Sequence, residues 1–352
     1  MKTGLLIGLF AAMVLGISCK EQKKSERGDL IVGAGKMPNL ARDNAGNLFV
    51  VFGSGDSILF ASSHDEGNTF SAPDVIAVLP HLVASSMRGP QIAATSSGLV
   101  VIAVNKSGNI FSFFKDDAGK WSQTAKVNDV DTVAKEGLMA LSADGNNAFA
   151  VWLDVRDRHN KIVGAKSTDG GRSWSKNIMV YASPDTTVCE CCKPSVAVKG
   201  AKVYVMFRNH LHGNRDLHII QSADGGSSFG EAQQLGKENW ALDGCPMDGG
   251  GLIINSNDVP ETVWRRRNII YACMPGQPET AIGEGKGCTI ESVNGKNVYA
   301  WTENGEVIIR KPAGTKINLG KGQLPLLKRI NKDHVICVWE NDKQVHAEIV
   351  SL

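Results

Sequence analysis

The sequence is poor in several features that would narrow its function. Aromatic residues make up 6% of the 352 positions, and only four of them are tyrosine. The formal net charge is +2, so no excess of positive charge argues for nucleic acid as a partner. No internal segment has the composition of a linker, which predicts one large domain after the N-terminus. The only long apolar run, residues 4–17, is too short for a transmembrane helix.

The N-terminus carries a targeting segment. Lys2 precedes the apolar run, and small residues lead into Cys19, so residues 1–18 resemble a bacterial lipoprotein signal peptide. Gly16 departs from the leucine usual at that position, and an ordinary cleaved signal peptide or a short membrane anchor is the alternative. Residues 19–28 are charged and read as a solvated tether. We therefore expect lipidation at Cys19 and a domain, residues 29–352, held at the membrane of a bacterial cell envelope, in the periplasm or at the surface.

One short phrase recurs along the chain. Its form is S-x-D-x-G-x-(S/T)-(W/F), and it occurs at residues 63–70, 167–174 and 222–229, with a degenerate copy at 117–121. The aspartates lie at 65, 117, 169 and 224, which are 52, 52 and 55 residues apart. Ser and Asp side chains bond to turn amides, and Gly accepts a positive φ, so each copy suits a tight turn after a strand. The period indicates a repeat architecture.

The phrase resembles the Asp-box, or BNR repeat, of sialidase-like β-propellers. This resemblance covers most of the chain and implies an all-β fold, with each box joining the third and fourth strands of a blade on the face away from the ligand. Alternating apolar residues then predict four-stranded blades along the chain. We count seven blades, with six as the alternative, and the last blade lacks one strand. Residues 29–32 supply it, so an N-terminal strand closes a single propeller.

The blade phase gathers sulfur at one mouth of the central channel. The loops entering three consecutive blades contain Cys189, Cys191, Cys192, Cys245 and Cys288, and by the same topology Met247, His210 and His212 lie within reach. In an exported protein these cysteines can form disulfides between loops. Alternatively, thiolates with His or Met can bind Cu or Zn, which accept soft sulfur ligands. Both interpretations remain open from the sequence.

Positive charge gathers at the same mouth. Arg88, Arg156, Arg208 and Arg265 follow or precede strands of four different blades. Converging guanidinium groups bind a carboxylate bidentately, although pairing with nearby aspartates is the alternative. Catalytic sialidases open their first blade with x-Arg-Ile-Pro, and this chain has Gly35-Lys36-Met37-Pro38, with Lys36 where the arginine stands. The family's tyrosine nucleophile and acid have no motif here that assigns them.

These observations lead to one functional hypothesis and two alternatives. The leading hypothesis is a cell-envelope lipoprotein whose propeller binds a ligand, either a small acidic glycan or a metal ion, at the Cys- and Arg-rich mouth without sialidase turnover. The first alternative is a glycoside hydrolase of exo-sialidase type that acts on acidic sugars. The second is a periplasmic metal-handling or assembly factor. The sequence leaves open whether the chain is an enzyme.

Overall fold

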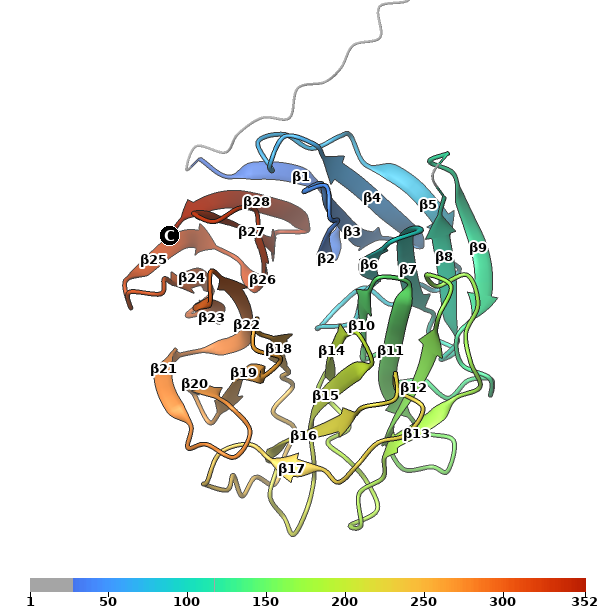
Figure 1. Cartoon of the computed structure of the whole chain (residues 1–352), viewed down its shortest axis with the longest axis vertical. Helices are drawn as coiled ribbons and strands as arrows, with labels where there is room; N and C mark the ends of the chain where they lie inside the picture. The colour runs from blue at the N-terminus through green and yellow to red at the C-terminus, as the bar shows by residue number, and fades with distance from the viewer. Residues whose placement is uncertain (1–27, 117) are drawn as a thin grey trace, which may run out of the picture.

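The protein is a ring of seven four-stranded sheets around a central channel, as a computed structural model shows (Figure 1). The structure describes residues 28–116 and 118–352; the leader, Cys19 and nearly all of the tether lie outside them. All the regular elements of the described residues are β-strands. No helix in this part of the chain has the length and apolar character needed to cross a membrane. The prediction of an all-β propeller with seven blades is confirmed, and the six-blade alternative is wrong.

The blades follow one another in sequence. Blades one to three comprise β2 (Lys36–Arg42), β3 (Leu48–Ser54), β4 (Ser57–Ser63), β5 (Asp74–Val78); β6 (Gln91–Thr95), β7 (Gly98–Val104), β8 (Ile110–Lys115), β9 (Trp121–Lys126); and β10 (Met139–Asp144), β11 (Asn147–Asp154), β12 (Lys161–Ser167), β13 (Ile178–Tyr181). Blades four to six comprise β14 (Ser195–Lys199), β15 (Lys202–Arg208), β16 (Leu217–Ser222), β17 (Gln233–Gln234); β18 (Gly250–Ile254), β19 (Pro260–Arg266), β20 (Ile269–Cys273), β21 (Thr280–Glu284); and β22 (Lys286–Val293), β23 (Lys296–Glu303), β24 (Glu306–Arg310), β25 (Lys316–Lys321).

The seventh blade joins the two ends of the described chain. It contains β26 (Gln323–Arg329), β27 (His334–Asn341), β28 (Gln344–Ser351) and, on the outside, β1 (Leu30–Ala34). β1 pairs antiparallel with β28, with Leu30 opposite Ala347, and Figure 1 shows the two strands side by side. Because this pairing covers the free edge of β28, the ring closes without an exposed strand there. The predicted N-terminal closure is confirmed.

The core lies between neighbouring blades. The second strand of each blade is buried on both faces; β11, for example, is buried from Ala148 to Asp154. One apolar cluster packs Phe149 and Val151 of blade three against Val205 and Phe207 of blade four. Fourth strands such as β9 are mostly exposed or half-buried. The near-continuous apolar runs of the second strands therefore reflect burial between two sheets, whereas the outer strands need few apolar residues.

The three boxes adopt one geometry. In blade three, Asp169 accepts hydrogen bonds from the backbone N–H of Ser173 and from the hydroxyls of Ser173 and Ser167, while Ser167 Oγ accepts from the Gly171 N–H. The other two boxes repeat these contacts. All three join third to fourth strands, as expected. The degenerate copy differs: its loop is held by Asp116, which accepts from the Lys120 N–H.

Candidate functional site

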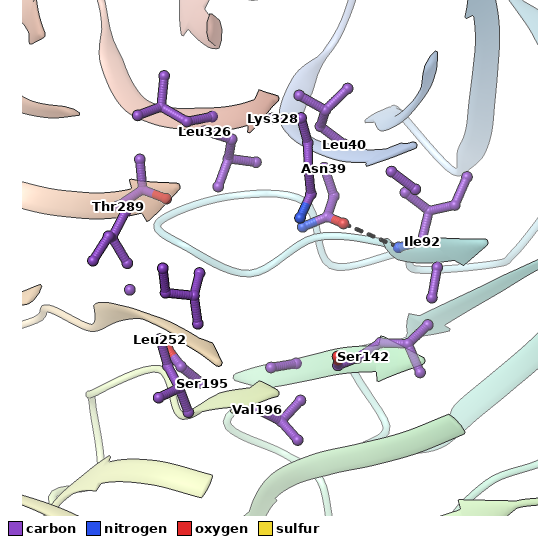
Figure 2. Close-up of a pocket in the computed structure, with 18 of the residues that line it drawn as sticks. Asn39, Leu40, Ile92, Ser142, Ser195, Val196, Leu252, Thr289, Leu326 and Lys328 are labelled. Carbon is purple, nitrogen blue, oxygen red and sulfur yellow. Dashed lines mark hydrogen bonds between the residues drawn. The ribbon is translucent and has the colours of Figure 1, made fainter. Parts of the chain in front are cut away.

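The channel is walled by the first strand of every blade. It encloses a cavity of about 270 Å³, lined by segments of β2, β6, β10, β14, β18, β22 and β26 and by the residues that precede β14. Figure 2 shows Asn39 and Leu40 bordering this space on one side and Leu252 and Thr289 on the other, and the Leu40 side chain packs in a core cluster. The Asn39 side chain ties two blades together, because its Oδ1 accepts from the Ile92 N–H at 3.1 Å. Several of the residues that line the cavity have small side chains, among them Ala93, Ser195 and Gly251.

Backbone bulges shape the mouth of the channel. The first strands of blades one, six and seven each slip register at their start, around Met37, Gly287 and Leu324. Each of these residues has a positive φ, which is 55° for Met37, 62° for Gly287 and 55° for Leu324. Bulges re-aim side chains and are frequent beside binding sites. Non-glycine residues with positive φ are costly, and they persist where the surroundings fix them.

Buried acceptors hold these bulges in place. The Met37 N–H donates to a carboxylate oxygen of Glu340 at 2.9 Å, and the Gly287 N–H donates to Asp248 at 3.1 Å. The Leu324 N–H donates to the Thr302 hydroxyl at 3.0 Å. All three acceptors are almost fully buried. The rim of the mouth is therefore positioned by hydrogen bonds from the neighbouring blade.

Among the described residues, one cation lines the main cavity of the mouth, amid apolar groups. A cavity of about 80 Å³ is lined by Lys193 together with Met37, Met87, Cys288, Leu324 and prolines and glycines of the same loops. An adjoining hollow of about 190 Å³ adds Met247, Asp248 and a second, exposed lysine, Lys286. Lys193 is half-buried, and its ammonium lies 3.0 Å from Gln91 Oε1. Burial lowers the pKa of Lys193 to about 8.

Lys193 has no acidic partner among the described residues. The two amide donors of Gln91 are used by the carbonyls of Gly89 and Pro90, so Gln91 presents its oxygen to the ammonium. Asn39 also donates to that oxygen at 3.1 Å. A lysine ammonium has three donors, and the glutamine takes one of them. The remaining donors lie beside the cavity and suit a carboxylate or hydroxyl of a ligand.

The four predicted arginines do not converge on the cavity. Arg156 forms a fork with Asp154 and also bonds to Asn177, at the outer part of blade three. Arg265 pairs with the buried Asp248. Both guanidinium NH2 groups of Arg208 are used by backbone carbonyls, of Arg215 and Arg265, at 2.7 Å each.

Arg88 and Lys36 also serve the framework. Arg88 donates to the backbone carbonyls of Glu136 and Ser86 and lies 3.7 Å from the Glu136 carboxylate. Lys36 begins β2, where it pairs with Gly53, and it is absent from the described lining of the mouth cavity. Pairing with an aspartate, the alternative, describes Arg156 and Arg265, whereas Arg208 bonds to backbone carbonyls. Lys193 is the lysine that lines the main cavity of the mouth.

Four of the five predicted cysteines lie close together. Cys191 forms a disulfide with Cys245, which links the loops entering blades four and five. The Sγ atoms of Cys189 and Cys192 lie 3.0 Å apart, and Cys189 Sγ lies 3.8 Å from Cys191 Sγ. Among the described residues, Cys189, Cys191 and Cys192 form the one group of three potential metal-ligand atoms within 4.8 Å. With Cys191 in a disulfide, two thiols remain, fewer than the ligands of a structural zinc site.

The remaining predicted sulfur and histidine positions lie apart from this group. Cys288 lines the mouth cavity but packs in a separate apolar cluster with Val263 and Trp301. Burial raises the pKa of the Cys288 thiol well above its usual value. His212 is exposed and faces Asp185 at 3.4 Å, and His210 accepts a bond from Ser183 through its backbone.

Electrostatics separates the two free thiols. A hydrogen bond with Cys192 is the main reason that the pKa of Cys189 falls to about 7, while burial opposes the fall and Arg208 and Arg215 assist it. Arg215 donates to Cys189 Sγ at 3.3 Å. Burial raises the pKa of Cys192 well above its usual value. At neutral pH the pair therefore consists of a partly ionised Cys189 and a protonated Cys192.

Sequence reasoning missed three residues of the site: Lys193, Gln91 and Asp248. Lys193 precedes Pro194, just as Met37 precedes Pro38 and Leu324 precedes Pro325. Aligning these x-Pro pairs by blade would have placed Lys193 at the mouth. Nothing in the sequence signals that Gln91 and Asp248 would be buried there.

Comparisons with known proteins find the fold alone. No protein-family model and no curated protein sequence matches this chain. Among solved structures it is similar to the Hadza microbial sialidase Hz136, with 14% identity and a TM-score of 0.52 over 91% of this chain and 66% of that one. It is also similar to the α-L-arabinanase of Penicillium chrysogenum, with 11% identity and a TM-score of 0.54 over 92% and 97% of the two chains.

A third similar structure is a PL25 ulvan lyase bound to -[GlcA(1-4)Rha3S]-, with 9% identity and a TM-score of 0.56 over 91% of this chain and 94% of the lyase. The chain thus spans slightly less than two thirds of the length of the sialidase and nearly the full length of the other two. These similarities establish that the fold is a sialidase-like β-propeller.

Proposed function

We propose that this chain is a lipid-anchored protein of the bacterial cell envelope whose propeller binds an acidic glycan at the channel mouth, without sialidase turnover. The observation that carries the proposal is Lys193, a half-buried cation beside the mouth cavity with no carboxylate partner among the described residues. A sugar carboxylate would supply that partner. The apolar side chains of Met37, Met87 and Leu324 offer surface for the face of a sugar ring.

The similar structures are consistent with a carbohydrate ligand. A sialidase, an arabinanase and an ulvan lyase share the fold, and the lyase was solved with a glucuronic-acid-containing fragment. For this chain, these similarities favour a carbohydrate as the class of ligand and do not identify the sugar. Lys193 narrows that class to sugars that carry a negative charge.

The positions of the tyrosines and carboxylates argue against sialidase turnover. Tyr181, Tyr204, Tyr271 and Tyr299 lie in β13, β15, β20 and β23, and none is among the described residues that line the mouth. The buried carboxylates there are engaged: Asp248 pairs with Arg265, and Glu340 accepts from the Met37 N–H. A glycoside hydrolase needs two carboxyl groups free to exchange protons or attack the sugar.

Calorimetric titration tests the proposal. We expect residues 20–352 to bind glucuronic acid or N-acetylneuraminic acid more tightly than galactose. Lys193→Met should weaken the acidic sugar at least tenfold, since a charge-assisted hydrogen bond is lost. Lys199→Met is the matched control: Lys199 ends β14, the strand that follows Lys193, lies at the opposite end of the channel and pairs with Asp258.

The pH dependence gives a second readout. The ammonium form of Lys193 is the one that binds an anion, and it is lost as the pH rises through about 8. Affinity for the acidic sugar should therefore be constant below pH 7 and fall above pH 8. Equal binding of acidic and neutral sugars, or turnover of an aryl sialoside that a single Tyr→Phe change abolishes, would contradict the proposal.

A further inference from the structure

A buried pair of thiols lies directly behind an accessible disulfide, at the edge of the mouth. Cys189 and Cys192 are almost fully buried, whereas Cys245 is exposed and Cys191 is half-buried. Cys189 Sγ contacts both Cys192 Sγ, at 3.0 Å, and Cys191 Sγ, at 3.8 Å. The four sulfurs therefore form a continuous line, Cys192 to Cys189 to Cys191 to Cys245, that runs from the core to solvent.

We propose that these four cysteines form a thiol–disulfide exchange site that reduces a partner disulfide at Cys245, with the Cys189–Cys192 dithiol as the electron donor. The proposal is independent of glycan binding, since it uses neither Lys193 nor the apolar rim. The substrate class is a disulfide-containing small molecule or protein.

The exchange begins inside the protein. The Cys189 thiolate attacks Cys191 Sγ; the Cys191–Cys245 bond breaks, and Cys245 leaves as an exposed thiolate. Cys192 loses its proton to solvent and attacks Cys189 Sγ, which releases Cys191 as a thiolate. The disulfide has then moved from Cys191–Cys245 to Cys189–Cys192 with no net oxidation. Thiolates are the attacking species in such steps, and a thiol with a pKa near the ambient pH attacks most effectively.

The second stage involves the partner. The Cys245 thiolate attacks a partner disulfide R–S–S–R′, forming a mixed disulfide and releasing R′–S⁻. Cys191 then attacks Cys245, which releases R–S⁻ and restores the Cys191–Cys245 bond. Two electrons pass from Cys189 and Cys192 to the partner, which leaves as two thiols, and the inner pair ends as a disulfide.

The surroundings of Cys189 favour the first step. Arg215 donates to Cys189 Sγ and also to the Glu190 carboxylate, at 3.1 Å. When Cys189 is ionised, the Cys192 thiol can donate a hydrogen bond to its sulfur. Cationic neighbours and thiol hydrogen bonds stabilise a thiolate. The lowered pKa of Cys189, about 7, agrees with this geometry. The C-x-x-C spacing of Cys189 and Cys192 matches that of disulfide oxidoreductases, which also use a thiolate beside a protonated thiol.

A single-turnover experiment tests the site. Protein purified anaerobically is mixed with oxidised glutathione, quenched with N-ethylmaleimide and mapped by fragment mass spectrometry. We expect two equivalents of reduced glutathione per chain, a new Cys189–Cys192 disulfide and a retained Cys191–Cys245 disulfide. The rate should rise about tenfold from pH 6 to pH 8 and level off above, as for a thiol with a pKa near 7.

Variants separate the relay from direct attack. Cys189→Ser should abolish glutathione release, and the double variant Cys191→Ser/Cys245→Ser, which keeps the inner dithiol, should slow it at least tenfold. Cys337→Ser, a buried thiol of β27, is the control and should react like the wild type. Unchanged kinetics in the double variant would overturn the proposal. So would thiols that never oxidise, or stoichiometric Cu or Zn that protects both inner thiols from alkylation.

Discussion

Adjacent glycines in one box make a matched pair for testing how the boxes support the ring. Gly225 and Gly226 have φ values of 71° and 84°, so alanine is strained at either position. A Cβ on Gly225 would meet nothing within 4 Å, whereas a Cβ on Gly226 would lie 2.4 Å from Cε2 of Phe149 in the preceding blade. The ring of Phe149 has little room to move, because Gly164 lies against its other edge, where a Cβ would also come within 2.4 Å.

The two alanine variants should therefore differ in stability. A left-handed alanine costs about 1 kcal/mol or slightly more, and overpacking a core adds about 1–3 kcal/mol. We expect Gly225→Ala to lower the free energy of unfolding by about 1 kcal/mol and Gly226→Ala by about 3 kcal/mol. Urea denaturation followed by tryptophan fluorescence measures both.

A double variant tests the cause of the difference. Phe149→Leu removes the ring edge, so Gly226→Ala should cost less in that background than in the wild type, with a coupling of at least 1 kcal/mol. Equal losses for Gly225→Ala and Gly226→Ala, or strict additivity with Phe149→Leu, would refute the inference that Gly226 is needed because Phe149 of the preceding blade packs against it.

Two further predictions concern the boxes and the leader. Asp169→Ala should lower the free energy of unfolding by about 1–3 kcal/mol, since it strands the Ser173 amide, and should leave ligand affinity unchanged. Burial alone would raise the pKa of Asp169, but hydrogen bonds from Ser173 and Ser167 hold it below its usual value. The stability that the ionised carboxylate contributes above pH 4 should therefore be lost as the pH falls and Asp169 becomes protonated. Cys19→Ala should yield an unprocessed or released form; detergent partitioning like that of a mature lipoprotein would contradict lipidation.

The fold was predictable because its signals are local and repeated. Each complete box forms its hydrogen bonds within eight residues, and alternating apolar residues mark the strands around it. The strand boundaries of one blade therefore predicted those of the next. The blades without a box show the same succession of four strands. The degenerate copy lies between the third and fourth strands of its blade, as predicted, but Asp117 lies outside the described residues; Asp116 accepts from the Lys120 N–H, and Trp121 begins β9.

The site was less predictable because it depends on which partners each side chain finds. Arg208 and Lys193 are both cationic residues beside strand ends at the mouth, and the sequence does not distinguish their roles. Arg208 donates to two backbone carbonyls, whereas Lys193 meets only the side chain of Gln91. Cys288 lies at the start of β22, at the mouth, as predicted. The bulge between Lys286 and Thr289 shifts the strand register at this point, and the Cys288 side chain packs in an apolar cluster. A one-residue slip in a strand reverses the face of a side chain, and loop sequence does not reveal it.

The contrast between the two ends of the channel bears on where the proposed ligand would bind. At the box end, polar side chains satisfy one another within each turn: Asp65, for example, bonds to Ser63 and Thr69. At the mouth, buried acceptors such as Glu340 hold Met37 in a strained left-handed conformation, and Lys193 keeps donors without an acidic partner among the described residues. Left-handed residues occur at both ends, Glu66 of the first box among them, so strain does not distinguish the ends. An unpaired charge costs stability, and its position at the mouth favours that end as the place where a ligand completes the structure.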